Sequence, residues 1–267
     1  MGLYTTAMPT LLENVKAQYD REGFVLFPHV LDEELIGEAT DHVAWLMAKH
    51  PELRPEQLHH GLVQNDPFWV RLVSDERLLD IAEQFIGPNV ALFASHYICK
   101  PPFTGQPVLW HQDGNYWPLD PMEVVTLWLA IDESLPENGC MRAIPGTHKL
   151  ELKEHVPNSD VESVLTTEIP AESVDESKAV DFVLPKGGVS VHHPNVIHGS
   201  NANTSPRRRC GLTIRYIPTS TRVTKPESGA LFLLRGEAVP GLNVYLPKPK
   251  YVAGEHFAFR GASLGSE

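Results

Sequence analysis

The sequence predicts a mainly β protein with flanking helices, built as a jelly roll, and three observations support this. The first third of the chain has apolar residues at helical spacing. The rest has short β-branched and apolar segments separated by Pro, Gly and Asn turns. Strands and helices do not alternate, which excludes a parallel doubly wound sheet. Several short strands at this spacing are typical of a jelly roll.

The helical part is expected over about residues 1–88. A helix over 10–22 leads into a first strand, Phe24–Phe27, which ends before Pro28. Asp32 stands where an N-cap is needed for an amphipathic helix over 32–49. A further helix over 75–86 ends at Gly87-Pro88.

The β core is expected over about 89–217 and a C-terminal extension over 218–267, the whole chain forming a single domain. Residues 150–178 are polar and acidic and predict a long surface excursion that could cover a site. The segment Leu231–Leu234 could pack over the barrel mouth or belong to an ordinary core. The core strands are predicted at Val90–Cys99, Val124–Ile131, Ala179–Leu184, Val189–His193 and Arg209–Ile217.

The composition narrows the class of protein. The chain has 267 residues and a formal net charge of −12, which argues against a nucleic-acid-binding surface. It has no apolar run long enough for a membrane span and does not end in Ser-Lys-Leu. Its three cysteines, Cys99, Cys140 and Cys210, form no C-x-x-C pair, so a disulfide framework is not expected. These features predict a reduced, cytoplasmic protein.

A candidate metal site begins in the stretch Trp110–Trp117. Because side chains alternate along an extended strand, His111 and Asp113 point to one face and Gln112 to the other. An imidazole beside a carboxylate supplies two arms of a 2-His-1-carboxylate triad for Fe(II). The same spacing occurs at His50 and Glu52, where no function is needed. Because the triad needs two imidazoles, a second histidine from another part of the chain must complete the site.

The segment His192–Ser200 contains three histidines and follows a short predicted strand. It lies where the mouth of a barrel would be, and His198 is the best candidate for the second imidazole. The alternative is a polar group at a strand edge. Arg209 enters the next strand and could hold a 2-oxoacid carboxylate by two parallel hydrogen bonds, with Ser200 as a further donor.

Five motifs in this order resemble the phytanoyl-CoA dioxygenase family, over most of the chain from the first strand to about residue 217. The resemblance implies a double-stranded β-helix, a cupin-like jelly roll, which holds Fe(II) and uses 2-oxoglutarate and O2 as cosubstrates. The motifs are Ile98–Pro102, His111–Asp113, Glu137–Cys140, Ile144–Lys149 and Ile197–Ser200.

The resemblance also implies roles for individual residues. His111, Asp113 and His198 match the metal ligands. Arg209 and Ser200 match the positions that bind the distal carboxylate of 2-oxoglutarate. Thr126 and Trp128 match positions that line the cosubstrate pocket, and Gln112, which belongs to the metal motif, is a further candidate for cosubstrate binding.

Other aromatic and histidine residues are candidates for the substrate pocket. Tyr116 and Trp117 follow the metal motif and could wall the pocket, although buried aromatic residues are equally common in plain core. His96 and His193 could also line the site. His148 lies in a Pro-Gly turn and is expected to be structural.

The implied activity is that of an Fe(II)- and 2-oxoglutarate-dependent dioxygenase. It would oxidise, and most simply hydroxylate, an unactivated C–H bond of a small metabolite, releasing succinate and CO2. Asp113 argues against halogenation, because related halogenases have a small residue there. The alternative is a non-redox metal-binding cupin-type isomerase or binding protein, which would have no use for Arg209.

Overall fold

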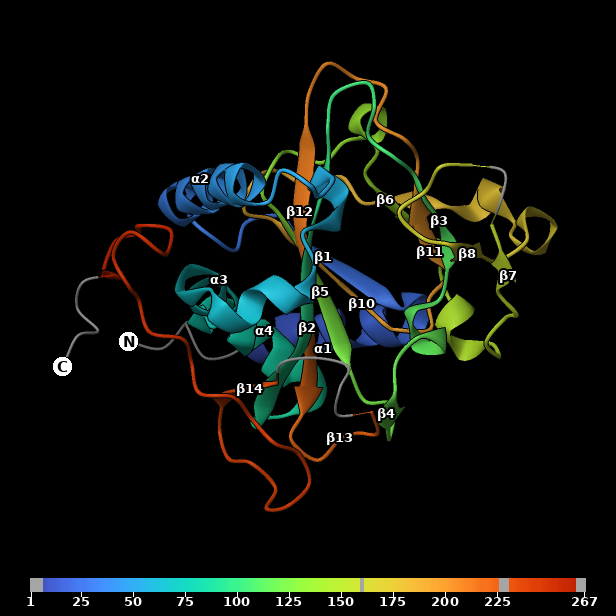
Figure 1. Cartoon of the computed structure of the whole chain (residues 1–267). Coiled ribbons are helices and arrows are strands. Elements are labelled where there is room, and N and C mark those ends of the chain that lie inside the picture. Colours follow the sequence, from blue (N-terminus) through green and yellow to red (C-terminus); the bar gives the residue numbers. More distant parts are fainter. Residues whose placement is uncertain (1–6, 159–160, 226–230, 263–267) are drawn as a thin grey trace.

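Two antiparallel sheets face each other in the computed structural model, which describes residues 7–158, 161–225 and 231–262 (Figure 1). This arrangement confirms the predicted jelly roll. The larger sheet has the order β1 (Phe24–Phe27), β10 (Val189–His192), β5 (Val125–Ala130), β12 (Arg209–Pro218), β2 (Val90–Lys100) and β14 (Phe232–Arg235). The smaller sheet has the order β3 (Val108–His111), β11 (His198–Ser200), β6 (Met141–Ala143) and β9 (Val180–Asp181). Two small pairs join β4 (Leu119–Asp120) to β13 (Arg222–Val223), and β7 (Val156–Pro157) to β8 (Thr167–Glu168).

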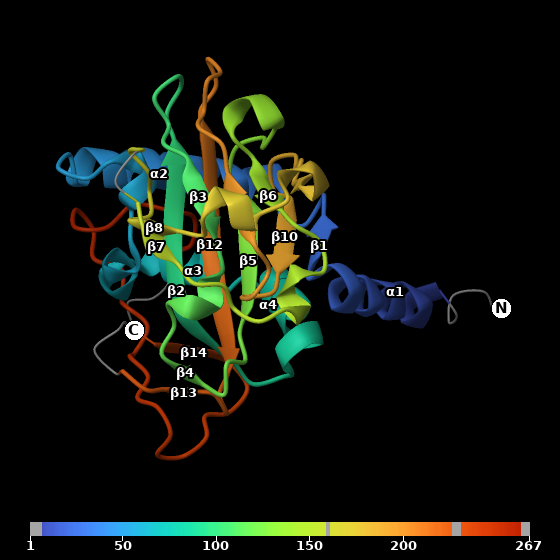
Figure 2. The same cartoon turned by 90° about the vertical axis from the view of Figure 1, so that its right-hand side faces the viewer.

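Helices cover the outer face of the larger sheet (Figures 1 and 2). Asp32 caps the second helix by accepting a hydrogen bond from the Leu35 N–H at 2.9 Å, as predicted. The α-helices are α1 (Ala7–Glu22), α2 (Glu33–Lys49), α3 (Pro67–Val73) and α4 (Glu76–Ile86). Short 3₁₀ turns are η1 (Pro55–Gln57), η2 (His60–Asn65), η3 (Asp113–Asn115), η4 (Pro136–Asn138), η5 (Thr147–Lys149), η6 (Ala171–Ser173) and η7 (Glu176–Lys178).

Strand alternation separates the helical core from the site. On β5, Leu127 and Leu129 point outward into the core shared with the helices, where each buried leucine contributes about 1.5–3 kcal/mol. Thr126 and Trp128 point inward, between the sheets. The inward face of the larger sheet therefore carries polar and aromatic groups for a site.

Gly211 shapes the inward face of β12. A Cβ added at this position would lie 1.9 Å from Cζ2 of Trp128, so the indole can cross β12 only because residue 211 has no side chain. Gly211 lies between the two inward-facing residues Arg209 and Thr213, and the indole is therefore held against the strand that carries Arg209.

Three features differ from the sequence predictions, and one open alternative is decided. The helix α3 was missed, although Asp66 caps it and Pro67 begins it. The predicted strand Ala179–Leu184 is reduced to β9 and a bridge from Ser134 to Leu184. The C-terminal strand β14 pairs with the edge of β2, and Phe232 is buried in the core, which decides between the two alternatives for Leu231–Leu234 in favour of ordinary core. Cys99 and Cys210 are register partners on β2 and β12 and bring their sulfur atoms into contact, a neighbour relationship that the sequence did not predict.

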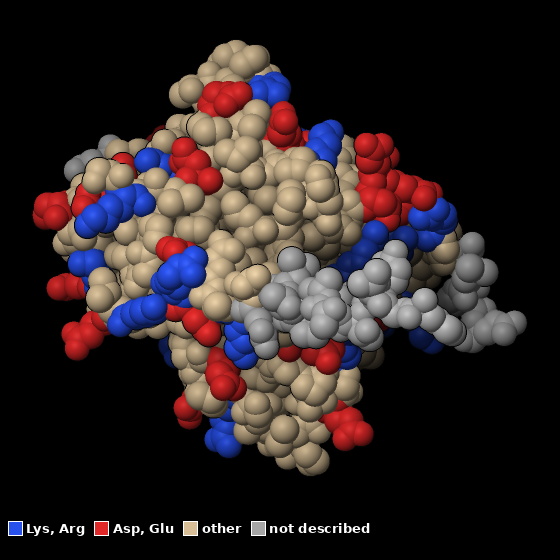
Figure 3. All heavy atoms as spheres, turned by 180° about the vertical axis from the view of Figure 1, so that it is seen from behind, with Lys and Arg blue, Asp and Glu red and all other residues tan. Residues whose placement is uncertain are grey.

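The surface carries mixed charge. On the face shown in Figure 3, acidic and basic side chains of the described residues are interspersed and form no basic stripe. None of the described helices is long and apolar enough to cross a membrane.

Candidate metal and cosubstrate site

His111 and His198 are direct cross-strand partners on β3 and β11, which brings their rings to a centroid separation of 4.0 Å. Each ring is held by the backbone carbonyl two residues earlier. Nδ1 of His111 lies 2.8 Å from the Leu109 oxygen, and Nδ1 of His198 lies 3.0 Å from the Val196 oxygen. Nδ1 must donate in both cases, so each Nε2 keeps a lone pair directed away from the strand.

Asp113 begins η3 and brings a carboxylate to the two imidazoles. One ligand atom from each of these three buried residues lies within 4.8 Å of the other two. Oδ2 of Asp113 is buried without a hydrogen-bond partner, and Oδ1 lies 3.7 Å from Nε2 of His111. An orphaned carboxylate oxygen beside two imidazole lone pairs fits a divalent cation.

The protonation states in this cluster also suit a cation. Burial alone would raise the pKa of Asp113, but the Arg215 guanidinium and then His192 bring it below its ordinary value. Burial lowers the pKa of His111, and it lowers that of His198 further, with His111 as the next contributor. The carboxylate is therefore ionised and both imidazoles are neutral, as metal ligation requires.

Arg209 lies at the other end of an inner compartment of about 50 Å³ that the three residues line. Its Nε and Nη2 donate to the Gly139 carbonyl at 3.0 and 2.7 Å, and its guanidinium carbon lies 5.1 Å from the centre of the Trp128 ring. Gly139 belongs to the turn that follows η4, so this turn fixes the arginine. Thr126 also lines the compartment, and its hydroxyl is buried without a hydrogen-bond partner.

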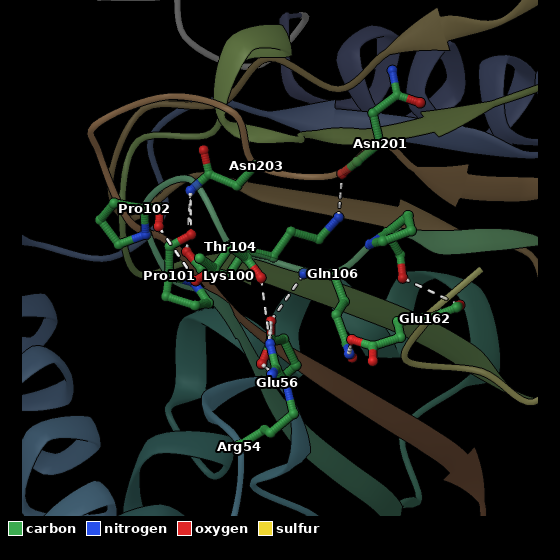
Figure 4. Close-up of polar contacts among 12 residues, drawn as sticks. Arg54, Glu56, Lys100, Pro101, Pro102, Thr104, Gln106, Glu162, Asn201 and Asn203 are labelled. Carbon is green, nitrogen blue, oxygen red and sulfur yellow. Dashed lines mark hydrogen bonds and ion pairs between the residues drawn. The ribbon is translucent and has the colours of Figure 1, made fainter.

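Lys100 was not singled out from the sequence, although it belongs to the quoted motif Ile98–Pro102. It is fully buried, and its Nζ donates to the Ser200 hydroxyl at 2.6 Å. Figure 4 shows a further bond, from this Nζ to the Asn201 carbonyl at 2.5 Å. Arg209 donates to the same Ser200 hydroxyl at 3.3 Å. Burial first, and then Arg209, lowers the pKa of Lys100 well below its usual range. Two buried basic side chains thus converge on one hydroxyl, and an anion at this end would favour the charged form of both.

An outer compartment of about 620 Å³ adjoins the inner one, since His111, Asp113 and Arg215 line both. The three residues predicted for a substrate pocket, His96, Tyr116 and Trp117, all line this outer space. Tyr116 also connects it to the surface excursion, because its hydroxyl lies 2.7 Å from Oγ1 of Thr167 and 3.0 Å from Nδ1 of His155.

Three residues that the sequence analysis considered, Gln112, His193 and His148, line neither compartment. Gln112 points away from both compartments and is held by the Asn195 carbonyl and the Lys153 N–H, at 2.7 and 2.8 Å, which does not support contact with a cosubstrate. His193 packs against Tyr19 and His148 and lines neither compartment. His148 lies in a turn, as expected.

Comparisons with known proteins find relatives named as dioxygenases and hydroxylases. It is 34% identical over 147 residues to a probable alpha-ketoglutarate-dependent hypophosphite dioxygenase of Stutzerimonas stutzeri, covering 54% of this chain and 51% of that one. It is 26% identical over 230 residues to an L-proline trans-4-hydroxylase of Streptomyces griseoviridis, covering 77% and 86%. The chain thus spans about half the length of the first relative.

Among solved structures, the fold matches that of the non-heme monooxygenase ThoJ in its apo form. The TM-score is 0.76 at 22% identity, over 94% of this chain and 92% of that one, which shows a shared fold. The family model for phytanoyl-CoA dioxygenase (PhyH) matches residues 19–211, more than two thirds of the sequence. The chain therefore belongs to the phytanoyl-CoA dioxygenase family.

Proposed function

We propose that this chain is an Fe(II)- and 2-oxoglutarate-dependent dioxygenase that hydroxylates an unactivated C–H bond of a small metabolite. In the overall reaction, substrate, 2-oxoglutarate and O2 would give the alcohol, succinate and CO2. One observation carries the proposal. The inner compartment is lined by the His-Asp-His cluster and by Arg209, and Lys100 and Arg209 both donate to the Ser200 hydroxyl in its wall. The dioxygenase and hydroxylase names of the relatives support it.

Fe(II) would be held by Nε2 of His111, Nε2 of His198 and the Asp113 carboxylate. Bound there, it would supply the oxidation chemistry with the two cosubstrates. The protein's part is to orient these groups. The carbonyls of Leu109 and Val196 fix both rings, so the three ligand atoms are arranged before the metal arrives.

The distal carboxylate of 2-oxoglutarate would lie against Arg209 and the Ser200 hydroxyl, with Lys100 behind Ser200, because the Lys100 ammonium donates to the Ser200 and Asn201 oxygens. The Gly139 carbonyl occupies Nε and Nη2 of Arg209, so the guanidinium is held in place rather than free to swing. Trp128 stacks beneath it. An anion here would offset the desolvation of two buried cations, which favours a dicarboxylate over a neutral ligand.

The substrate would occupy the outer compartment, next to Asp113 and between Tyr116, Trp117 and His96. The second candidate class is a non-redox metal-binding cupin. It would account for the His-Asp-His cluster but gives no role to Lys100 and Arg209, so these two residues favour the dioxygenase.

The test is an anaerobic titration of the Fe(II)-loaded protein with 2-oxoglutarate, monitored by the visible metal-to-ligand charge-transfer band. The proposal expects a saturable band that weakens sharply in Arg209→Gln and is lost in Asp113→Ala. The control is Arg142→Gln, which removes a guanidinium paired with Asp181 and lining neither compartment. Bound iron without a band in the unmodified protein would contradict the proposal and favour the non-redox cupin.

A further inference from the structure

Strand β12 carries a second arginine toward the pocket. Arg209, Thr213 and Arg215 all face inward and line the inner compartment, but only Arg215 also lines the outer one. The two guanidiniums therefore serve different spaces. Arg209 is enclosed at the proposed cosubstrate end, whereas Arg215 faces the space left for the substrate.

The Arg215 side chain is fixed along one side of its guanidinium. Nη1 donates to Nδ1 of His96 at 3.0 Å and lies 3.4 Å from the Thr213 hydroxyl. Its guanidinium carbon lies 5.0 Å from the centre of the Trp117 ring. His96 must present a lone pair to Nη1, so the imidazole is neutral and cannot act as a counter-ion.

The other side of the guanidinium is not satisfied by the described chain. Nε is buried without a hydrogen-bond partner. Nη2 makes no hydrogen bond to any described residue, and its acidic neighbour, Oδ1 of Asp113, is 3.8 Å away. Nε and Nη2 form the edge with which an arginine binds a carboxylate through two parallel hydrogen bonds. Nη2 is the donor that an oxoanion in the pocket would meet first.

The acidic side chain near Arg215 among the described lining residues of the outer compartment is Asp113, which a bound metal would share. Among its described lining residues, Arg215 is the one lysine or arginine. The Glu56 carboxylate also lines it, but Arg54 donates to both of its oxygens at 3.1 and 3.2 Å, and the Gln106 N–H donates at 3.0 Å (Figure 4). Asp113 would be engaged by the metal. A guanidinium that is only 11% exposed gains from a ligand that brings a negative charge.

We infer that Arg215 recognises an oxoanion on the substrate, a carboxylate or a phosphonate, while the apolar remainder lies in the outer compartment against Phe93 and Trp117. This inference rests on the proposed function and names the substrate class of the same site. Arg215 is then a specificity-determining residue, distinct from Arg209 at the cosubstrate.

The competing explanation is that Arg215 serves only to hold Asp113. The two explanations make different predictions for substitution. A positioning role predicts weaker Fe(II) binding in Arg215→Gln and the same ligand preference as the unmodified protein. A recognition role predicts loss of the preference for anions over neutral ligands of the same shape.

The experiment measures ligand binding by anaerobic calorimetry to the Fe(II)- and 2-oxoglutarate-saturated protein. The probes are propionate, cyclohexanecarboxylate and 3-phenylpropionate, the primary amide of each, and the phosphonate analogues. The charge-transfer band is followed in parallel, so displacement of 2-oxoglutarate by a probe is detected. The variants are Arg215→Gln, Arg215→Lys and the control Arg142→Gln, which removes the same charge away from the pocket.

We expect at least one acid or phosphonate to bind about tenfold or more tightly than its amide, as for a charge-assisted hydrogen bond. Arg215→Gln should remove this preference without changing amide binding, Arg215→Lys should retain part of it, and Arg142→Gln should leave it intact. Carboxylates and phosphonates that bind no better than amides, or a preference that survives in Arg215→Gln, would overturn the inference. Absence of the charge-transfer band in the unmodified protein would count against the proposed function. The role of Arg215 would still be decided, by comparing the ligand preference of Arg215→Gln with that of the unmodified protein.

Discussion

Lys100 and Arg209 are register partners on β2 and β12, and their side chains reach the same Ser200 hydroxyl at 2.6 and 3.3 Å. Burial lowers the pKa of both residues, that of Arg209 to about 10. Each of these two basic groups disfavours the positive charge on the other unless an anion lies beside them. The pair is therefore most stable with a ligand bound.

Replacing Lys100 should weaken cosubstrate binding. In Lys100→Met the stem volume is kept and the charge is lost, so the Kd for 2-oxoglutarate should rise about tenfold or more. Calorimetry on the Fe(II)-loaded protein measures this change. Lys178→Met is the control, because Lys178 is exposed and pairs with Asp175 on the surface. An unchanged Kd in Lys100→Met would show that Arg209 alone holds the carboxylate.

Two histidines with the same local motif should differ in metal binding. His111→Ala removes one of the three clustered ligand atoms, so Fe(II) affinity should fall at least about a hundredfold, because a chelating ligand is lost. His50→Ala disrupts the other His-x-acid pair, in which His50 lies 3.3 Å from Glu52 at the surface, and should leave iron binding unchanged. Equilibrium dialysis of iron measures both. Equal losses in the two variants would contradict the assignment of the cluster.

Site residues that belong to short sequence motifs could be predicted from the sequence. His111, Asp113 and Arg209 line one compartment, as proposed from the sequence. The reason differs for Asp113, because β3 ends at His111 and Asp113 begins η3 instead of continuing an extended strand. Lys100 was missed because its role depends on the pairing of β2 with β12, which no local pattern reveals. The pairing of Cys99 with Cys210 was missed for the same reason, since 111 residues separate them.

Gly211 supports the cosubstrate end through its lack of a side chain. In Gly211→Ala the new Cβ would collide with the Trp128 ring, so the indole must move and Arg209 loses its stacking partner. We expect a weaker charge-transfer band and a free energy of unfolding lower by about 1–3 kcal/mol. Gly37→Ala in α2 is the control, because no atom lies within 4 Å of its added Cβ and it should stabilise the helix by up to about 1 kcal/mol. Urea unfolding measures both, and a band of full intensity in Gly211→Ala would contradict the role of the indole.

Tyr116 should anchor the excursion over the outer compartment. Tyr116→Phe removes the hydroxyl that contacts Thr167 and His155 and keeps the ring. Backbone amides of residues 155–168 should then exchange faster in hydrogen-exchange measurements, because two hydrogen bonds to the wall of the pocket are lost. Tyr251→Phe is the control, since Tyr251 lines neither compartment. Unchanged exchange over 155–168 would show that the excursion is held by its other contacts.

His193 should make the protein sensitive to mild acid. Burial first, and then His148 and His192, lowers the pKa of His193 to about 4. The unfolded chain binds a proton near pH 6.5 while the folded protein does not, so stability is full above pH 6.5 and falls as the pH drops toward 4. The loss from this residue is at most about 3 kcal/mol, given about 1.4 kcal/mol for each pH unit between the two values.

The variant that tests this is His193→Asn, which removes the titrating group. Its side-chain oxygen can still accept the hydrogen bond that the Asn195 N–H donates to Nδ1 of His193 at 3.0 Å. Urea unfolding at pH 7 and pH 5 should show a smaller loss in this variant than in the unmodified protein, and an equal loss in both would assign the acid sensitivity to other buried histidines.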